Sequence, residues 1–149
     1  MNRTHISRRS VLQAGAAAAC GLANLPAGAC EFFAPTLRVT HPWTRATPDD
    51  STTAIVCMSF DEITQDDRLI GIEAAFATGA EMVLGGRSVP VDLPLPRGGV
   101  VTLVESGTHL RLHGLTQALE LGRAYPIRLL FEQGGPLRAN LTVDFARFR

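Results

Sequence analysis

The sequence predicts an all-β domain, built as an antiparallel sandwich or barrel. Short runs of apolar and β-branched residues follow one another along the chain, and Gly, Pro and Asp residues separate them at regular spacing. From Leu137 to Phe145 apolar residues alternate with polar ones, which is typical of a strand with one buried face. No segment after residue 30 predicts a long helix. Many short strands joined by tight turns are characteristic of antiparallel folds.

Eight segments are expected to form strands, and turn residues delimit most of them. The segment 52–60 is apolar and β-branched, with Pro48-Asp49-Asp50 before it and Asp61-Glu62 after it. The third segment follows the turn signal Asp66-Asp67, and the fourth ends at Gly85-Gly86. In chain order the segments are 37–40, 52–60, 68–72, 80–84, 100–104, 108–115 (a short strand running into a turn), 125–132 and 137–145.

The connections between the later segments differ in kind. A proline-rich link over residues 90–96 leads to Gly98-Gly99, where the fifth segment begins. Residues 115–121 are compatible with a helical turn or with a loop. Gln133-Gly134-Gly135-Pro136 predicts a hairpin connection between the last two strands.

The first 29 residues are expected to be a cleaved export signal. A basic start is followed by an apolar, Ala- and Gly-rich run from Val11 to Leu25, and Ala27-Gly28-Ala29 provides the small residues that a signal peptidase accepts. Ser7 to Leu12 matches a twin-arginine export signal. The run is too short and too rich in small residues to favour a membrane anchor. We therefore expect a twin-arginine signal peptide over residues 1–29, one β-domain over residues 31–149, no transmembrane helix in the mature protein, and a periplasmic location.

The cysteines leave the processing of the mature N-terminus open. Cys30 directly follows the expected cleavage site, so it is a candidate for lipid attachment, but a lipoprotein signal prefers Leu where this chain has Ala27. Simple cleavage is therefore favoured over a lipid anchor. A Cys30–Cys57 disulfide would require that Cys30 be retained, so no disulfide framework is assumed.

Charge and composition argue against two classes of function. From Glu31 onward the chain has eleven arginines, no lysine and fourteen acidic residues, a formal charge of −3 without a basic cluster, which disfavours nucleic acid as a partner. An enzyme is not expected either, because Ser51 and Ser59 have no placed base. Cys57 lies in an apolar strand without a neighbouring histidine in the sequence, so we expect a small buried side chain there.

The segment 108–115 carries the candidate chemistry. Successive side chains alternate between the two faces of a strand, so His109, Arg111 and His113 share one face, and Leu110 and Leu112 share the other. Two imidazoles on one face suggest a metal site, with His109 and His113 as candidate ligands. The positively charged guanidinium between them argues against such a site.

Several segments, in this order, resemble the periplasmic PCu(A)C copper chaperones. The resemblance extends over nearly the whole expected mature chain, although no single motif decides it. The segments that carry it are His41 to Pro48, Ala54 to Phe60 with Met58, Asp67 to Gly71, Leu95 to Leu103 with its Pro-Arg-Gly-Gly turn, and Gly107 to Leu115.

The resemblance implies a cupredoxin-like Greek-key β-barrel or sandwich that binds Cu(I) through histidine and methionine and has no enzymatic activity. It also implies delivery of copper toward the binuclear copper site of a respiratory oxidase. The implied partners are an oxidase copper-site subunit or a thioredoxin-like copper protein. Imidazole and thioether form a chemically sensible ligand set for Cu(I) outside the cytoplasm.

This sequence departs from the family at the ligands themselves. The first family histidine aligns with Val83, or with Ala80 in a shifted register, and the segment that carries the next methionine is shortened to Gly85–Ser88. The final ligand pair is a histidine followed two residues later by a methionine. His109 matches the histidine, and Arg111 replaces the methionine.

Two hypotheses therefore stand. In the first, Cu(I) is bound through His109 with His113, Met82 or Met58. The pair His109 and His113 needs a bend, because four residues of extended strand span about 13 Å. Gly114 could supply this bend, whereas Met82 needs a shifted register. In the second hypothesis, the protein is a metal-free interaction module of the cell envelope.

Overall fold

The computed structural model describes residues 30–144, and these form eleven β-strands without an α-helix. The expected signal peptide, residues 1–29, and Phe145 lie outside the described residues. The strands are β1 (Glu31–Ala34), β2 (Leu37–Thr44), β3 (Thr53–Asp61), β4 (Asp67–Glu73), β5 (Gly79–Leu84), β6 (Arg87–Val89), β7 (Leu93–Leu95), β8 (Val101–Thr102), β9 (His109–His113), β10 (Ala124–Phe131) and β11 (Gly135–Val143).

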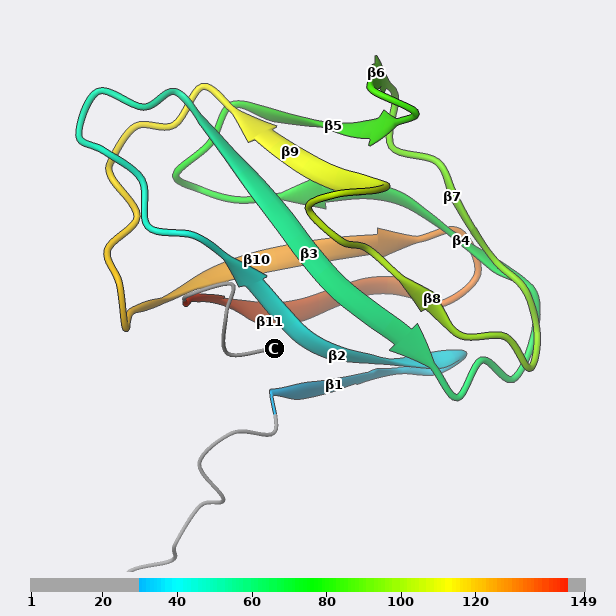
Figure 1. Cartoon of the computed structure of the whole chain (residues 1–149). Helices are drawn as coiled ribbons and strands as arrows, with labels where there is room; N and C mark the ends of the chain where they lie inside the picture. The colour runs from blue at the N-terminus through cyan, green and yellow to red at the C-terminus, as the bar shows by residue number, and fades with distance from the viewer. Residues whose placement is uncertain (1–29, 145–149) are drawn as a thin grey trace, which may run out of the picture.

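The strands form one curled sheet that encloses the core like a half-barrel (Figure 1). Its order is β6-β5-β9-β3-β2-β11-β10-β4-β7, with β1 beside β2 and β8 beside β3. All neighbours are antiparallel except β2 and β11, which pair in parallel at Trp43 and Thr44. The first half of β3 pairs with β9, and its second half pairs with β2 and β8. The all-β prediction is therefore confirmed.

Alternation along β3 separates the core from the outer face of the sheet. Ala54, Val56, Met58 and Phe60 are buried in the main hydrophobic core. Phe60 meets Phe131 of β10 edge to face, with ring centroids 6.2 Å apart. The residues between them, among which is Cys57, point to the other side of the strand. The core thus fills the space between the two curled halves of the sheet.

The structure differs from the sequence expectations mainly at short or irregular strands. β2 continues past residue 40 through a bulge, where His41 adopts a φ of 48° and the register with β3 shifts. The proline-rich link contains the edge strand β7, in which Pro94 is tolerated because an edge strand needs fewer ladder hydrogen bonds. Residues 115–121 form a loop rather than a helical turn.

Two further expectations concern the chain termini and membranes. Cys30 and Cys57 are not joined by a disulfide in the described part of the chain. Between residues 30 and 144, no helix is long and apolar enough to cross a membrane.

Asp67, at the start of β4, ties three parts of the chain together. The buried carboxylate accepts hydrogen bonds from the Thr36 hydroxyl at 2.7 Å, the Gln133 amide at 2.8 Å and the Gly134 amide at 3.0 Å. It also accepts one from the Arg68 amide at 2.8 Å. Burial on its own would raise the pKa of Asp67, but these four donors together lower the pKa below its ordinary value.

We expect Asp67→Asn to lower the free energy of unfolding by about 1–3 kcal/mol at neutral pH, because an amide cannot accept from all four donors. The ionised carboxylate stabilises the fold above the ordinary aspartate pKa of about 3.9, and this stabilisation is lost as the pH falls through the lower folded-state value. Denaturant unfolding at pH 7 and at pH 3 measures both effects, and the variant should show a smaller pH dependence.

Asp92→Asn is the matched control. Asp92 is an exposed carboxylate that pairs with Arg68, so its change should stay within about 0.5 kcal/mol. Equal losses in the two variants would contradict the anchoring role of Asp67.

Candidate metal centre

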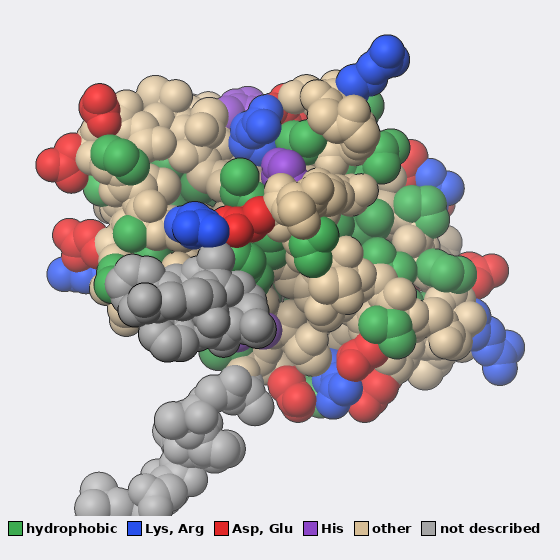
Figure 2. Space-filling model, viewed as in Figure 1, with side chains coloured by type: hydrophobic (Ala, Val, Ile, Leu, Met, Phe, Trp, Pro, Cys, Tyr) green, Lys and Arg blue, Asp and Glu red, His purple; other side chains and the backbone are tan. Residues whose placement is uncertain are grey.

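Strand β9 presents its candidate residues on the outer face of the sheet. Leu110 and Leu112 are buried in the main core, so His109, Arg111 and His113 point the other way. In the space-filling view, histidine side chains lie beside a basic side chain over the region where β5 and β9 run (Figure 2). The shared face expected from the sequence is present in the fold.

His109 is buried, and only one of its two ring nitrogens has a hydrogen-bond partner. Its side chain is 6% exposed, and its Nδ1 lies 2.8 Å from the carbonyl oxygen of Gly107, to which it donates. Its Nε2 is buried and has no hydrogen-bond partner. The bond at Nδ1 leaves the lone pair on Nε2. Metal-binding histidines have this arrangement, with one nitrogen held by a carbonyl and the other on the metal.

A short turn supplies the carbonyl that orients His109. The Gly107 amide donates to the Val104 carbonyl at 3.1 Å, and the Val104 amide donates to the Thr108 carbonyl at 2.9 Å. These bonds fold residues 104–108 into a compact loop just before β9. A Cβ at position 107 would lie 3.0 Å from a methyl group of Val104, so a larger residue there would have to displace the Val104 side chain.

His109 belongs to a buried row that crosses four strands on the outer face. Val83 of β5 is paired with His109, and Trp43 of β2 is paired with Cys57 of β3. The register of β3 and β9 ends at Val56 opposite Leu110, and one further step places Cys57 opposite His109. We call Val83, His109, Cys57 and Trp43 the outer row. Its members are 6%, 6%, 0% and 7% exposed, and none belongs to the main core.

The 104–108 loop and an ion pair flank the outer row. The Arg45 Nη2 donates to Glu105 Oε2 at 2.8 Å, which joins the loop to the chain just after Trp43. This pair raises the pKa of Arg45. A cavity of about 450 Å³ opens beside Trp43 and is lined by the same loop. Its remaining lining comes from β2, β3, β8 and Leu103, which follows β8.

Arg111 forms an ion pair with Glu81 and lies on the outer face in the cross-strand row next to that of His109. It is opposite Ile55 on one side and Glu81 on the other, and its Nη1 lies 3.2 Å from Glu81 Oε1. The same oxygen of Glu81 accepts from Ser88 at 3.0 Å. The guanidinium charge beside His109 is therefore compensated by a neighbour on β5.

The structure does not bring the imidazoles of His109 and His113 together. They lie at opposite ends of β9 with Arg111 between them, and Gly114, at a φ of 65°, turns the chain only beyond His113. The exposed ring of His113 lies across Gly79, where an added Cβ would be 2.4 Å from the ring carbon Cε1. The pairing of these two histidines on one metal stays a prediction.

The candidate methionines face the core. Met82 is paired with Leu110 and is 4% exposed, and Met58 is 2% exposed; both belong to the main hydrophobic cluster. In the described part of the chain, no group of three or more His, Cys, Asp or Glu side chains is placed to hold a metal. Sequence reasoning missed Cys57, because its proximity to His109 arises from strand pairing and not from spacing.

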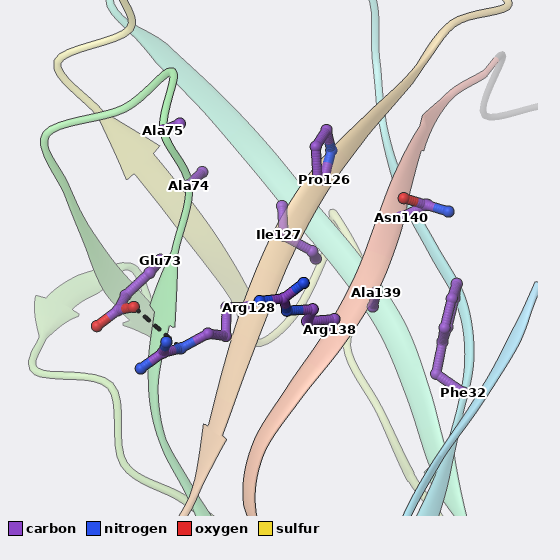
Figure 3. Close-up of a pocket in the computed structure, with 10 residues that line it drawn as sticks. All are labelled: Phe32, Glu73, Ala74, Ala75, Pro126, Ile127, Arg128, Arg138, Ala139 and Asn140. Carbon is purple, nitrogen blue, oxygen red and sulfur yellow. Dashed lines mark ion pairs between the residues drawn. The ribbon is translucent and has the colours of Figure 1, made fainter.

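A second cavity, of about 590 Å³, lies away from these residues (Figure 3). Its walls come from β4 and the two alanines that follow it, from β10 and β11, and from Phe32 of β1. Arg128 pairs there with Glu73 at 3.3 Å, and Arg138 lies opposite Arg128 on the neighbouring strand. With two arginines and without a histidine, cysteine or methionine, this cavity has no donor set for a soft cation.

Comparisons with known proteins agree with this fold. Residues 37–143 match the family described as "Putative lipoprotein LpqE-like". The structure is similar to a copper-bound PCuAC domain from PmoF2, with 26% sequence identity and a TM-score of 0.70, covering 76% of this chain and 97% of that one. It is also similar to the solution structure of CuI-DR1885 from Deinococcus radiodurans, with 25% identity and a TM-score of 0.63, covering 74% of this chain and 78% of that one.

A further likeness supports the fold alone. The apo PCuAC domain from PmoF1 is 24% identical with a TM-score of 0.69, covering 76% of this chain and 98% of that one. Among curated protein sequences, none matches this chain. The family match extends over most of the chain, and the fold is the cupredoxin-like fold of the PCuAC domains. The chain therefore belongs to the LpqE-like family, which is of the PCuAC copper-chaperone type.

Proposed function

We propose that this protein carries Cu(I) as cargo and that His109 is the central ligand. The observation that carries the proposal is the buried Nε2 of His109, which lacks a partner while Nδ1 is held by Gly107. An unpaired polar atom in a protein interior costs about 1–3 kcal/mol, so its retention needs a reason. A bound soft cation provides one, and the copper-bound state of the related domain supports this choice of ion.

The residues around His109 fit a monovalent soft cation. A neutral imidazole is a suitable ligand for copper. The Gly107 carbonyl fixes the tautomer, so the ring does not need to reorganise when the ion arrives. Trp43 and Val83 exclude water from the row, and Glu81 compensates the charge of Arg111 beside it.

The proposed setting is the bacterial periplasm. Residues 1–29 act as a twin-arginine signal peptide, and residues 31–149 form the copper-carrying domain. The family's description as a lipoprotein supports export, with Cys30 either unmodified or acylated at the new N-terminus. The recipient is the copper-site subunit of a respiratory oxidase or a thioredoxin-like copper protein.

The alternative is a metal-free interaction module. Two positions at which this chain lacks the expected family ligand favour it. Val83 stands opposite His109 at the position where the family resemblance expects a histidine, and an ion pair between Arg111 and Glu81 stands where it expects a methionine. In this reading, the outer row is a second small core.

His109→Ala tests the copper-carrying function. We expect the wild-type protein to take up one Cu(I) against a chelator in the absence of oxygen. The variant should bind more weakly by more than about 100-fold, because losing a direct ligand should exceed the effect of losing an outer-shell partner. Circular dichroism of both proteins verifies that the variant is folded.

His113→Ala is the matched control on the same strand. Its ring is exposed at the far end of β9, so the affinity for Cu(I) should stay close to that of the wild type. If the wild type and both variants fail alike to compete with the chelator, the copper-carrying function is wrong for this protein and the interaction module stands.

Arg111→Met tests the position at which the family carries a methionine. The change puts a thioether on the same face as His109, two residues away, and removes a positive charge. We expect Cu(I) affinity to rise by at least about tenfold, equivalent to about 1.4 kcal/mol. Arg111→Leu removes the charge without adding sulfur, so the difference between the two variants measures the thioether. Equal affinities would show that this position is remote from the ion.

A further inference from the structure

We propose that the thiolate of Cys57 is the second Cu(I) ligand, opposite His109, so that this chain holds copper between a sulfur and a nitrogen from neighbouring strands. The inference rests on the proposed copper-carrying function and specifies the ligand set of that same site. It assigns a metal-binding role to a cysteine that the sequence alone marks as a small buried side chain.

Strand pairing brings the two side chains together. β3 and β9 are antiparallel, and their pairing ends at Val56 and Leu110; one further step in the same register places Cys57 opposite His109. Residues directly opposite one another in an antiparallel pair share a face, and their Cβ atoms lie about 4.5–5.5 Å apart. An ion between the two side chains can therefore be reached from both strands without a change of register.

Burial supports the pair independently of position. Cys57 is fully buried, and His109 is 6% exposed with its Nε2 unpartnered. Neither residue contributes to the main core, so packing of the two sheet halves does not explain the burial. The unpaired Nε2 of His109 indicates that a bound ligand, and not another protein atom, is its partner.

The charges resolve the objection raised by Arg111. When Cu(I) binds, the S–H bond of Cys57 breaks, the proton leaves to solvent, and the sulfur and the His109 Nε2 each form a bond to copper without a change in oxidation state. The thiolate carries −1 and the ion +1, so the bound unit is neutral. A neutral unit suits an apolar row and is not repelled by the neighbouring guanidinium, whereas copper bound by imidazole and thioether alone would keep its positive charge.

The alternative sulfur ligands are turned away from this spot. Met58 follows Cys57 directly and therefore points to the opposite face, into the core. Met82 is paired with Leu110 and also faces the core. Thiolate and thioether are both soft donors for Cu(I), and the negative charge of the thiolate adds an electrostatic attraction to the cation. Of the sulfur atoms in the described strands, that of Cys57 is the one beside His109.

The cavity beside Trp43 lies at the Trp43 end of the outer row, and neither Cys57 nor His109 lines it. It is lined by Trp43 and by residues 103–106, which precede the loop's contact with His109. Trp43 is also the residue paired with Cys57 on the side away from β9.

The experiment uses the full chain carrying Cys20→Ser and Cys30→Ser, so that Cys57 is the remaining thiol of the three cysteines. Cu(I) competition and copper X-ray absorption are measured on this protein and on the same protein with Cys57→Ala. We expect sulfur and nitrogen neighbours around copper in the parent. In Cys57→Ala the sulfur signal should disappear, and the affinity should fall by more than the roughly 10–100-fold typical of an outer-shell change.

Two control variants separate the possible outcomes. Met58→Leu should retain the sulfur signal, and Ser59→Ala, on the outer face two residues beyond Cys57, should retain the affinity. A parent protein that binds Cu(I) in a His109-dependent manner, but shows only nitrogen or oxygen neighbours, overturns the role of Cys57 and leaves the copper-carrying function intact. A parent protein that does not bind Cu(I) overturns both. The X-ray absorption spectrum of the parent protein shows by itself whether sulfur is bound to copper. The proposal can therefore be tested even if Cys57→Ala does not fold.

Discussion

The organisation of this domain depends on β3, which belongs to both halves of the curled sheet. Its even-numbered residues from Ala54 to Phe60 fill the core, and its partner changes from β9 to β8 near Cys57. Between these two partners the chain leaves the sheet as the 104–108 loop and returns at His109. The strand that supports the core therefore also sets where the loop, the histidine and the cysteine meet.

The sequence was sufficient for the fold class and for the facing of the histidines, because alternation and turn residues are local signals. The facing of all five residues of β9, His109 to His113, follows from period-two alternation alone. The proximity of Cys57 to His109 could not be predicted in this way, since the two residues are 52 positions apart in the chain and meet only through register. The bulge at His41 was missed because it interrupts the alternation of β2. The strands β1, β6 and β7 were missed because segments of three or four residues are too short for an alternating pattern to be recognised.

The proposed site illustrates how a binding function can reduce stability in the absence of its ligand. A domain of this size is stable by only about 5–15 kcal/mol, so an unsatisfied imidazole in the outer row is a noticeable loss. Binding of copper to the folded state alone would recover it through linkage. The ion pair of Arg111 with Glu81 instead favours the folded protein without copper, because it pairs a positive charge that would otherwise lie unpaired beside the outer row.

The two ends of the sheet have a consequence for how the domain meets other molecules. β6 has only three residues, and β7, at the other end, carries Pro94 at its centre, which removes a backbone donor. Short edges and edge prolines are poor templates for an added strand. Polymerisation through these two ends of the sheet is therefore disfavoured.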